Sequence, residues 1–201
     1  MKVTFMGAGS TVFSKNVLGD TMLCEAFHDM EIALYDIDAH RLEESYLLIT
    51  KMNESINEGR ATVKKYLGVE QRKDALRKAD FVVDAIQVGL YDPCTIIDFE
   101  IPKKYGLRQT IADTLGVGGV MRALRTIPVM EEFAHDMEEV CPDAFFLNYT
   151  NPMAILSGYM QRYTGIKTVG LCHSVQCCVE TLLKDLDMDA SPERLARIRS
   201  K

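Results

Sequence analysis

The chain alternates short apolar segments with longer amphipathic ones, and this alternation limits the folds open to it. Segments rich in β-branched and aromatic residues are predicted as strands over 2–6, 31–35, 61–66, 81–88, 144–147 and 167–171. Helices are predicted over 39–58, 73–78, 95–105, 121–140, 153–163 and 175–186, with a last one beginning at Ser191-Pro192. Apolar strands that are each followed by a helix are typical of a parallel sheet covered on both faces. With right-handed crossovers, the sequence predicts an α/β fold with a doubly wound parallel sheet.

Composition narrows the class of protein. The chain has 201 residues, 47% of them hydrophobic, which suits one domain over 1–201. Its net charge of −6 and its short basic clusters exclude a nucleic-acid partner. No apolar run reaches the roughly 18 residues of a membrane helix, and the N-terminus lacks the features of a signal peptide. We therefore expect a cytoplasmic protein without a membrane partner, whose six cysteines are reduced and mostly buried.

A glycine-rich turn follows the first predicted strand and opens a helix. Gly7 permits the tight turn, and Gly9 lets the backbone at Gly9-Ser10 approach a pyrophosphate at the helix N-terminus. Asp36 ends the second strand, where a carboxylate can accept hydrogen bonds from ribose hydroxyls and would repel a 2′-phosphate. Asp38 is the alternative if that strand is longer. Since Val12 stands where a third glycine is usual, the turn alone is a weak signal, but its context predicts a Rossmann-like domain that binds NAD.

Polar residues also follow the later strands, where ligands bind in such sheets. Asn151 precedes Pro152 and is predicted to bind a sugar hydroxyl or, equally, to satisfy a turn. Cys172 and His173 follow the last strand. Their spacing with Cys177 and Cys178 is too crowded for a zinc knuckle, so the latter two are predicted to pack in a helix. Cys172 is either a metal-binding thiolate or buried filler, and His173 either a second ligand or a proton donor.

Six segments taken together resemble a known family. They are MGAGSTVF, LYDID, ADFVVDAIQVG, IADTLGVGGVMRALRTIP, LNYTNPMA and VGLCHSVQ. In this order they resemble the NAD- and metal-dependent glycosidases of glycoside hydrolase family four, in particular its α-galactosidase (melibiase) branch. The resemblance implies a lactate/malate dehydrogenase-like NAD-binding domain, in which residues 148–201 begin the substrate and metal region.

The resemblance also implies a mechanism and a set of residues. NAD+ takes a hydride from carbon 3 of a galactoside, a manganese ion binds the hydroxyls at carbons 2 and 3, and the aglycone leaves before water adds. Cys172 is the implied metal ligand, His173 the implied catalytic proton donor and Asn151 the implied substrate-binding residue. Gly7, Gly9, Ser10 and Asp36 match the cofactor site, whereas Asp113 and Arg122 receive no role.

The resemblance implies further that the family's second metal ligand, a histidine, and its tyrosine base lie beyond residue 201. The chain is thus expected to be the N-terminal portion of a homo-oligomeric enzyme, without its C-terminal catalytic half, and to be inactive alone. Two alternatives stand beside this hypothesis. One is an NAD-dependent 2-hydroxy acid dehydrogenase, which needs no metal, and the other is a non-catalytic NAD-binding fragment.

Overall fold

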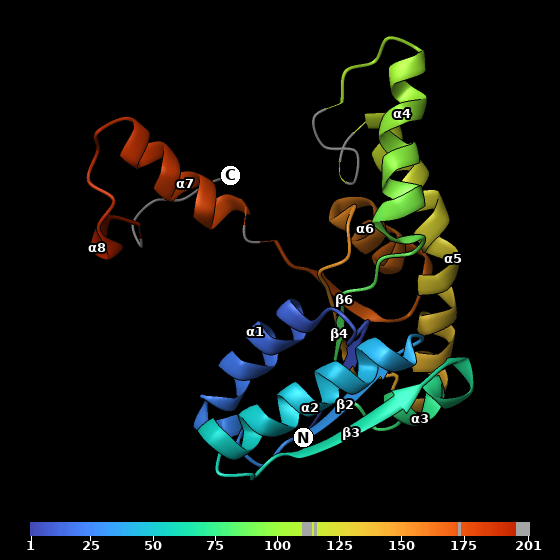
Figure 1. Ribbon diagram of the computed structural model, residues 1–201, viewed down its shortest axis with the longest axis vertical. Coiled ribbons are helices and arrows are strands. Elements are labelled where there is room, and N and C mark those ends of the chain that lie inside the picture. The colour runs from blue at the N-terminus through green and yellow to red at the C-terminus, as the bar shows by residue number, and fades with distance from the viewer. Residues whose placement is uncertain (110–113, 115, 173, 196–201) are drawn as a thin grey trace. The chain divides into compact units, whose positions relative to one another are not determined.

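The computed structural model describes residues 1–109, 114, 116–172 and 174–195. Its centre is a parallel sheet in the order β3-β2-β1-β4-β5-β6 (Figure 1). The strands are β1 (Lys2–Met6), β2 (Glu31–Asp36), β3 (Thr62–Leu67), β4 (Phe81–Asp84), β5 (Phe145–Asn148) and β6 (Lys167–Gly170). Because the chain runs outward from β1 in one direction and from β4 in the other, the strand order reverses between these two neighbours. Ligands bind at such a reversal, beyond the carboxyl ends of the strands.

Helices follow the strands as the alternation predicts. They are α1 (Thr11–Met22), α2 (Ala39–Ile56), α3 (Arg72–Leu76), α4 (Ile96–Lys104), α5 (Gly116–Val140), α6 (Met153–Tyr163), α7 (Ser174–Asp185) and α8 (Pro192–Leu195). Short helical turns are η1 (Glu25–Phe27), η2 (Val69–Gln71) and η3 (Leu90–Thr95). The chain forms two compact units, Met1–Gly170 and Leu171–Lys201, so the predicted domain over 1–201 includes both, and each is described by itself.

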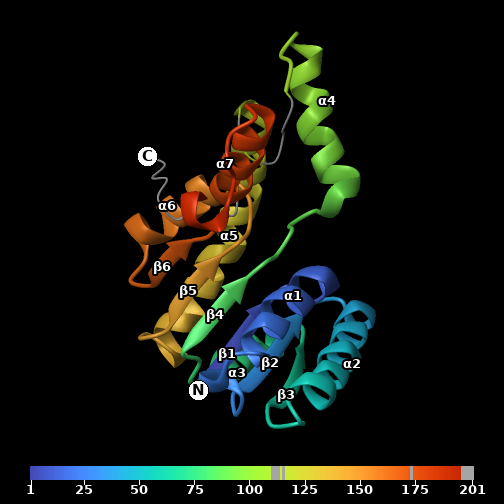
Figure 2. The same ribbon diagram turned by 90° about the vertical axis from the view of Figure 1, so that its left-hand side faces the viewer.

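Helices flank the sheet of the first unit (Figures 1 and 2). One apolar layer is buried on each face of the sheet. Successive strand residues alternate between the layers, so Phe5 and Val83 face α1 and α2, whereas Val82 and Phe146 face the opposite side. That opposite layer also contains Leu76 of α3, Met130 of α5, and Leu156 and Met160 of α6. This arrangement confirms the predicted doubly wound sheet.

The observed bounds differ most from the predicted ones at two places. The strand predicted over 81–88 ends at Asp84, and residues 85–88 lie outside the sheet, before Gly89 and Leu90 adopt left-handed backbone angles. Helix α5 begins five residues earlier than predicted, at Gly116. There the side-chain oxygen of Gln109 accepts a hydrogen bond from the Gly118 amide, which satisfies one of the donors that a helix N-terminus leaves open. Within the described residues, no helix combines the length and apolarity needed to cross a membrane.

Candidate functional site

The turn after β1 is built around Gly7. The Gly7 and Ala8 amides both donate to the Tyr35 carbonyl, at 3.0 and 2.9 Å, and tie the turn to the end of β2. On the other side, a Cβ atom added to Gly7 would lie 2.8 Å from the Ala85 carbonyl oxygen, after β4. Gly7 also has a φ of +82°, which other residues rarely adopt. The tight turn therefore requires glycine, as predicted.

Gly9 positions the acidic residue at the end of β2. Its amide donates to Asp36 Oδ2 at 2.6 Å, and the Asp38 amide donates to Asp36 Oδ1 at 2.9 Å. A Cβ atom on Gly9 would lie 2.8 Å from Asp36 Oδ2. The carboxylate is thus held in place by backbone donors while each oxygen keeps a lone pair for a further hydrogen bond.

Asp38, the alternative acid, has a different role in the structure. Its Oδ1 accepts hydrogen bonds from the His40 and Arg41 amides, both at 3.0 Å, and so caps the N-terminus of α2. These bonds, the one from Arg41 foremost, hold the pKa of the Asp38 carboxyl below its usual value. The geometry favours Asp36 over Asp38 for a ribose.

The N-terminus of α1 follows the glycine turn. Ser10 is its N-cap residue, but no side-chain hydrogen bond caps the helix there. The amides of a first helical turn have no partner within the helix, and the helix dipole favours an anion near them. The amides of Gly7 to Ser10 are bonded to Tyr35, to Asp36 and within the turn, so the backbone donors open to a pyrophosphate are those of the first turn of α1.

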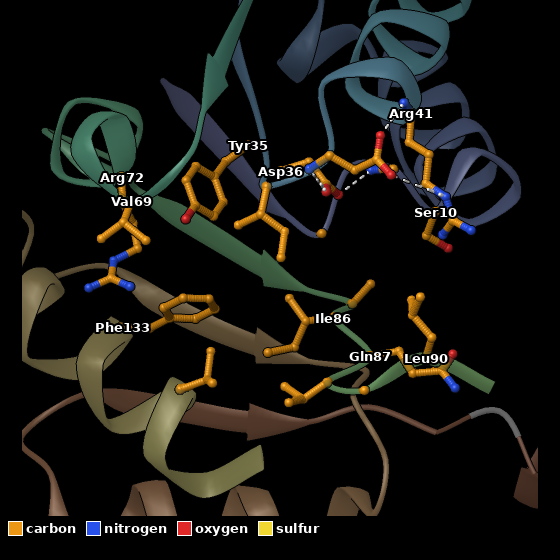
Figure 3. Close-up of a pocket in the computed structure, with 18 of the residues that line it drawn as sticks. Ser10, Tyr35, Asp36, Arg41, Val69, Arg72, Ile86, Gln87, Leu90 and Phe133 are labelled. Atoms are coloured by element: carbon orange, nitrogen blue, oxygen red, sulfur yellow. Dashed lines mark hydrogen bonds and ion pairs between the residues drawn. The ribbon is translucent and has the colours of Figure 1, made fainter. Parts of the chain in front are cut away.

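These elements line one cavity of about 560 Å³ at the carboxyl ends of β1, β2 and β4 (Figure 3). Its lining residues are Gly7, Gly9, Ser10, Tyr35, Asp36, Ile37, Asp38, Arg41, Val69, Arg72, Ala85, Ile86, Gln87, Val88, Gly89, Leu90, Val129, Glu132 and Phe133. In Figure 3, Ser10 and Arg41 lie at one end, Tyr35, Arg72 and Phe133 lie at the other, and Ile86 lies between them. The volume is in the range of small-molecule sites, which is about 300–1,000 Å³.

The end of the cavity opposite the glycine turn has apolar walls and one cation, Arg72, whose charge is balanced by two carboxylates. Arg72 donates to Asp136 at 2.5 Å and to Glu132 at 2.9 Å, and its guanidinium lies 5.3 Å from the centre of the Phe133 ring. Burial raises the pKa of the neighbouring Tyr35 hydroxyl. From the turn, the cavity thus offers anion donors, then a carboxylate and then apolar walls. This order fits the pyrophosphate, ribose and adenine of a dinucleotide.

Asn151 lies outside this cavity, in the segment after β5. Its Oδ1 accepts a hydrogen bond from the Met153 amide at 3.4 Å, so it takes part in the turn that begins α6. The peptide bond between Asn151 and Pro152 is cis. Since β5 pairs with β4, Asn151 follows the strand next to the cavity, in the region where the sequence predicts it.

The predicted metal-binding segment belongs to the second unit. Cys172 is exposed, and His173 and Asp113 lie outside the described residues. In the described part of the chain, no three His, Cys, Asp or Glu side chains gather closely enough to hold a metal ion. A single thiolate does not suit manganese, which prefers oxygen and imidazole ligands. The described residues therefore do not by themselves fit a manganese site.

The expectation for the cysteines is partly wrong. All six are free thiols, but only Cys141 is buried, and burial raises its pKa to about 11. Cys177 and Cys178, predicted to pack in a helix, lie on α7 of the second unit but are exposed.

The sequence analysis missed one polar residue at the carboxyl ends of the strands, Asp84. Asp84 ends β4 with its side chain fully buried, and neither carboxylate oxygen has a hydrogen-bond partner among the described residues. Burial raises its pKa to about 7, and the Thr150 hydroxyl and the Ile86 amide act in the opposite direction. A single acid inside the apolar run FVVDAIQV was the signal that could have found it.

Comparison with known proteins gives the family. The model of family 4 glycosyl hydrolases matches residues 2–188, and the chain belongs to this family. An α-galactosidase of Bacillus subtilis (strain 168) is 59% identical over 199 residues, which are 98% of this chain and 45% of that protein. The chain thus spans about half the length of this curated relative.

Solved structures share the fold. The structure of the putative glucosidase lplD from Bacillus subtilis has a TM-score of 0.78 at 28% identity. The match covers 96% of this chain and 43% of that protein. The 6-phospho-β-glucosidase from Thermotoga maritima with manganese, NAD+ and glucose 6-phosphate has a TM-score of 0.76 at 24% identity. The match covers 94% of this chain and 44% of that protein. These similarities agree with the doubly wound sheet.

Proposed function

We propose that this chain is the NAD-binding part of an NAD- and divalent-metal-dependent α-galactosidase. The observation that carries the proposal is the fixed Asp36 carboxylate beside the glycine turn, in a cavity whose order of groups matches a dinucleotide. The family and the high identity to an α-galactosidase support a galactoside as substrate and favour a glycosidase over a dehydrogenase.

In this proposal the first unit holds the cofactor. The glycine turn with Gly9 and Ser10 lets the backbone approach the pyrophosphate, which rests on the amides of the first turn of α1, and Asp36 accepts hydrogen bonds from the adenosine ribose. Bound there, NAD+ would supply a hydride acceptor for the sugar. The carboxylate would repel a 2′-phosphate, so NAD is preferred to NADP.

The remaining site residues lie after the later strands. Asn151 binds a sugar hydroxyl, Cys172 is one ligand of a divalent metal ion, and His173 donates a proton to the leaving group. The metal ion needs further ligands from outside the described residues, because these provide no group of three. This proposal also includes the full set of metal ligands, a catalytic base and a homo-oligomer. Their support is membership of the family, not the geometry of the cavity.

Binding of NADH to the 201-residue chain tests the cofactor part. The chain has 8 tyrosines and no tryptophan, so energy transfer from tyrosine to the bound nicotinamide reports binding. We expect saturable binding of NADH, much weaker binding of NADPH, and a loss of about tenfold or more in NADH affinity for Asp36→Ala. Asp143→Ala is a matched control, because Asp143 is an exposed acid outside the cavity. Equal affinity of the Asp36 and Asp143 variants would contradict the assignment.

Hydrolysis of p-nitrophenyl α-galactoside tests the substrate and metal part. The chain is assayed alone and joined to the region of the Bacillus subtilis α-galactosidase that its match leaves uncovered. We expect hydrolysis only by the joined protein, only with both NAD+ and Mn2+, and not after Cys172→Ser. Activity that persists without the metal ion would argue for a different reaction.

A further inference from the structure

One peptide unit of the glycine turn, between Ala8 and Gly9, is held by a side chain at each of its polar ends. Its amide donates to Asp36 Oδ2 at 2.6 Å. Its carbonyl accepts a hydrogen bond from the Ser45 hydroxyl of α2, also at 2.6 Å. The carbonyl and the amide of a trans peptide point in opposite directions. Asp36 and Ser45 therefore hold this peptide unit from opposite sides.

Ser45 reaches the turn because α2 packs directly against it. Arg41 and Ser45 are four residues apart on α2, so they lie on the same face of this helix. A Cβ atom added to Gly9 would lie 2.8 Å from Arg41 Cβ, which shows how closely this face approaches the turn. Ser45 is fully buried, so bulk solvent does not compete for its hydroxyl.

The other hydroxyls near this peptide unit have different partners. Ser14 on α1 lies 3.5 Å from the Ala8 carbonyl oxygen but only 3.1 Å from the Ser10 carbonyl oxygen. Since a serine hydroxyl has one proton, Ser14 has a better acceptor within its own helix. The Thr11 hydroxyl lies 3.5 Å from the Ser45 hydroxyl. Among the described residues, Ser45 is therefore the main side-chain donor to the Ala8 carbonyl.

Loss of the Ser45 hydroxyl would release the peptide unit. The Ala8 carbonyl would keep only the long contact with Ser14, and a buried carbonyl without a good donor is costly. Because glycine adopts a wide range of φ, the unit can rotate at Gly9 towards another donor. Such a rotation also turns the Gly9 amide away from Asp36, since both groups belong to one rigid plane. The Asp36 carboxylate would then lose one of the two backbone donors that orient it.

We propose that Ser45 is a positioning residue that orients the Asp36 carboxylate for the adenosine ribose through the peptide unit between Ala8 and Gly9. The contact of Asp36 with a ribose rests on the proposed function, whereas the hold of Ser45 on the peptide unit does not. Ser45 is not among the residues that line the cavity, so its effect on cofactor binding is indirect and passes through Asp36.

The NMR signal of the Gly9 amide proton tests the hold on the peptide unit in the 201-residue chain without any ligand. A short hydrogen bond to a carboxylate moves such a signal downfield. We expect Ser45→Ala to move it upfield, because the amide turns away from Asp36. Ser55→Ala is a matched control on the same helix and should leave the signal unchanged, since the exposed Ser55 donates to the Lys51 carbonyl within α2.

Binding of NADH separates positioning from general support of the turn. We expect Ser45→Ala to weaken NADH binding by about fivefold and Ser55→Ala to have no effect. In a chain that already carries Asp36→Ala, the added change Ser45→Ala should cause no further loss, because the carboxylate that Ser45 orients is gone. A turn that is merely loosened would lose NADH affinity equally in both backgrounds.

The outcomes distinguish this inference from the proposed function. A Gly9 amide signal that Ser45→Ala leaves unchanged overturns the inference, whether or not NADH binds. An equal loss of NADH affinity with and without the Asp36 carboxylate also overturns it. A Gly9 signal that responds to Ser45→Ala, in a wild-type chain that does not bind NADH, refutes the proposed function and the role towards the ribose, and it confirms the hold of Ser45 on the peptide unit.

Discussion

Replacement of Asp84 by asparagine should make folding stability less dependent on pH. The pKa of the Asp84 carboxyl is about 7 in the folded protein, against about 3.9 in an unfolded chain. Because the folded value is raised, the native state binds the proton more tightly. Stability from this group is complete below about pH 4 and is lost as the pH rises towards 7.

The magnitude follows from the shift. A shift of about three pKa units corresponds to roughly 4 kcal/mol of stability lost between about pH 4 and pH 8, at about 1.4 kcal/mol per pH unit in the middle of that range. Asparagine has nearly the same shape and does not ionise, so it removes this loss. Its buried amide keeps a desolvation cost at every pH, which shifts the whole curve without changing its slope.

Urea unfolding followed by circular dichroism measures the effect. The free energy of unfolding is determined for the wild type and for Asp84→Asn at several pH values. The difference, variant minus wild type, should grow by roughly 4 kcal/mol from about pH 4 to about pH 8. Asp20→Asn, on the exposed side of α1, should show no such growth. A difference that stays constant with pH would refute the reasoning, because it would mean that Asp84 has the same pKa in both states.

Three further changes test the packing by the same urea measurement. Gly7→Ala should lower the free energy of unfolding by about 2 kcal/mol or more. The φ of +82° disfavours alanine, and the new Cβ would lie 2.8 Å from the Ala85 carbonyl oxygen. An effect below about 0.5 kcal/mol would contradict this. Arg125→Ala should cost about 3 kcal/mol, since it leaves the fully buried Asp98 carboxylate without the partner that donates to it at 2.6 Å, and the added change Asp98→Leu should recover part of this loss. Phe146→Ala should cost about 3–5 kcal/mol, because this side chain is fully buried between the sheet and α6; a smaller loss would mean that the layer collapses around the gap.

The cofactor turn was predictable because its requirements are local. Gly7 and Gly9 stand within a few residues of the first strand, and the positive φ and close contacts that they meet leave room for no other residue. The choice between Asp36 and Asp38 was less local. It depended on the residue at which β2 ends and α2 begins, and the structure shows that Asp38 caps the helix.

The burial of the Asp84 carboxyl could not be predicted from its position in the chain. An acid within an apolar segment is compatible with a strand end, a turn or a buried site. The strand predicted over 81–88 placed Asp84 in the middle of a strand, whereas β4 ends at this residue. The prediction therefore did not place its carboxyl at the end of a strand.

The sequence by itself determined which segments are strands and helices, since periodicity and turn residues act over a few positions. It also determined the family, because the motifs and their order are present in the chain alone. Only the tertiary structure decided that Met6, Asp84 and Asn148 stand side by side, because strand order and register depend on how the crossovers pack over the whole sheet. It likewise decided that the Asp84 carboxylate has no hydrogen-bond partner among the described residues, since burial and the shortage of donors around one carboxyl are properties of all its neighbours together and not of any one segment.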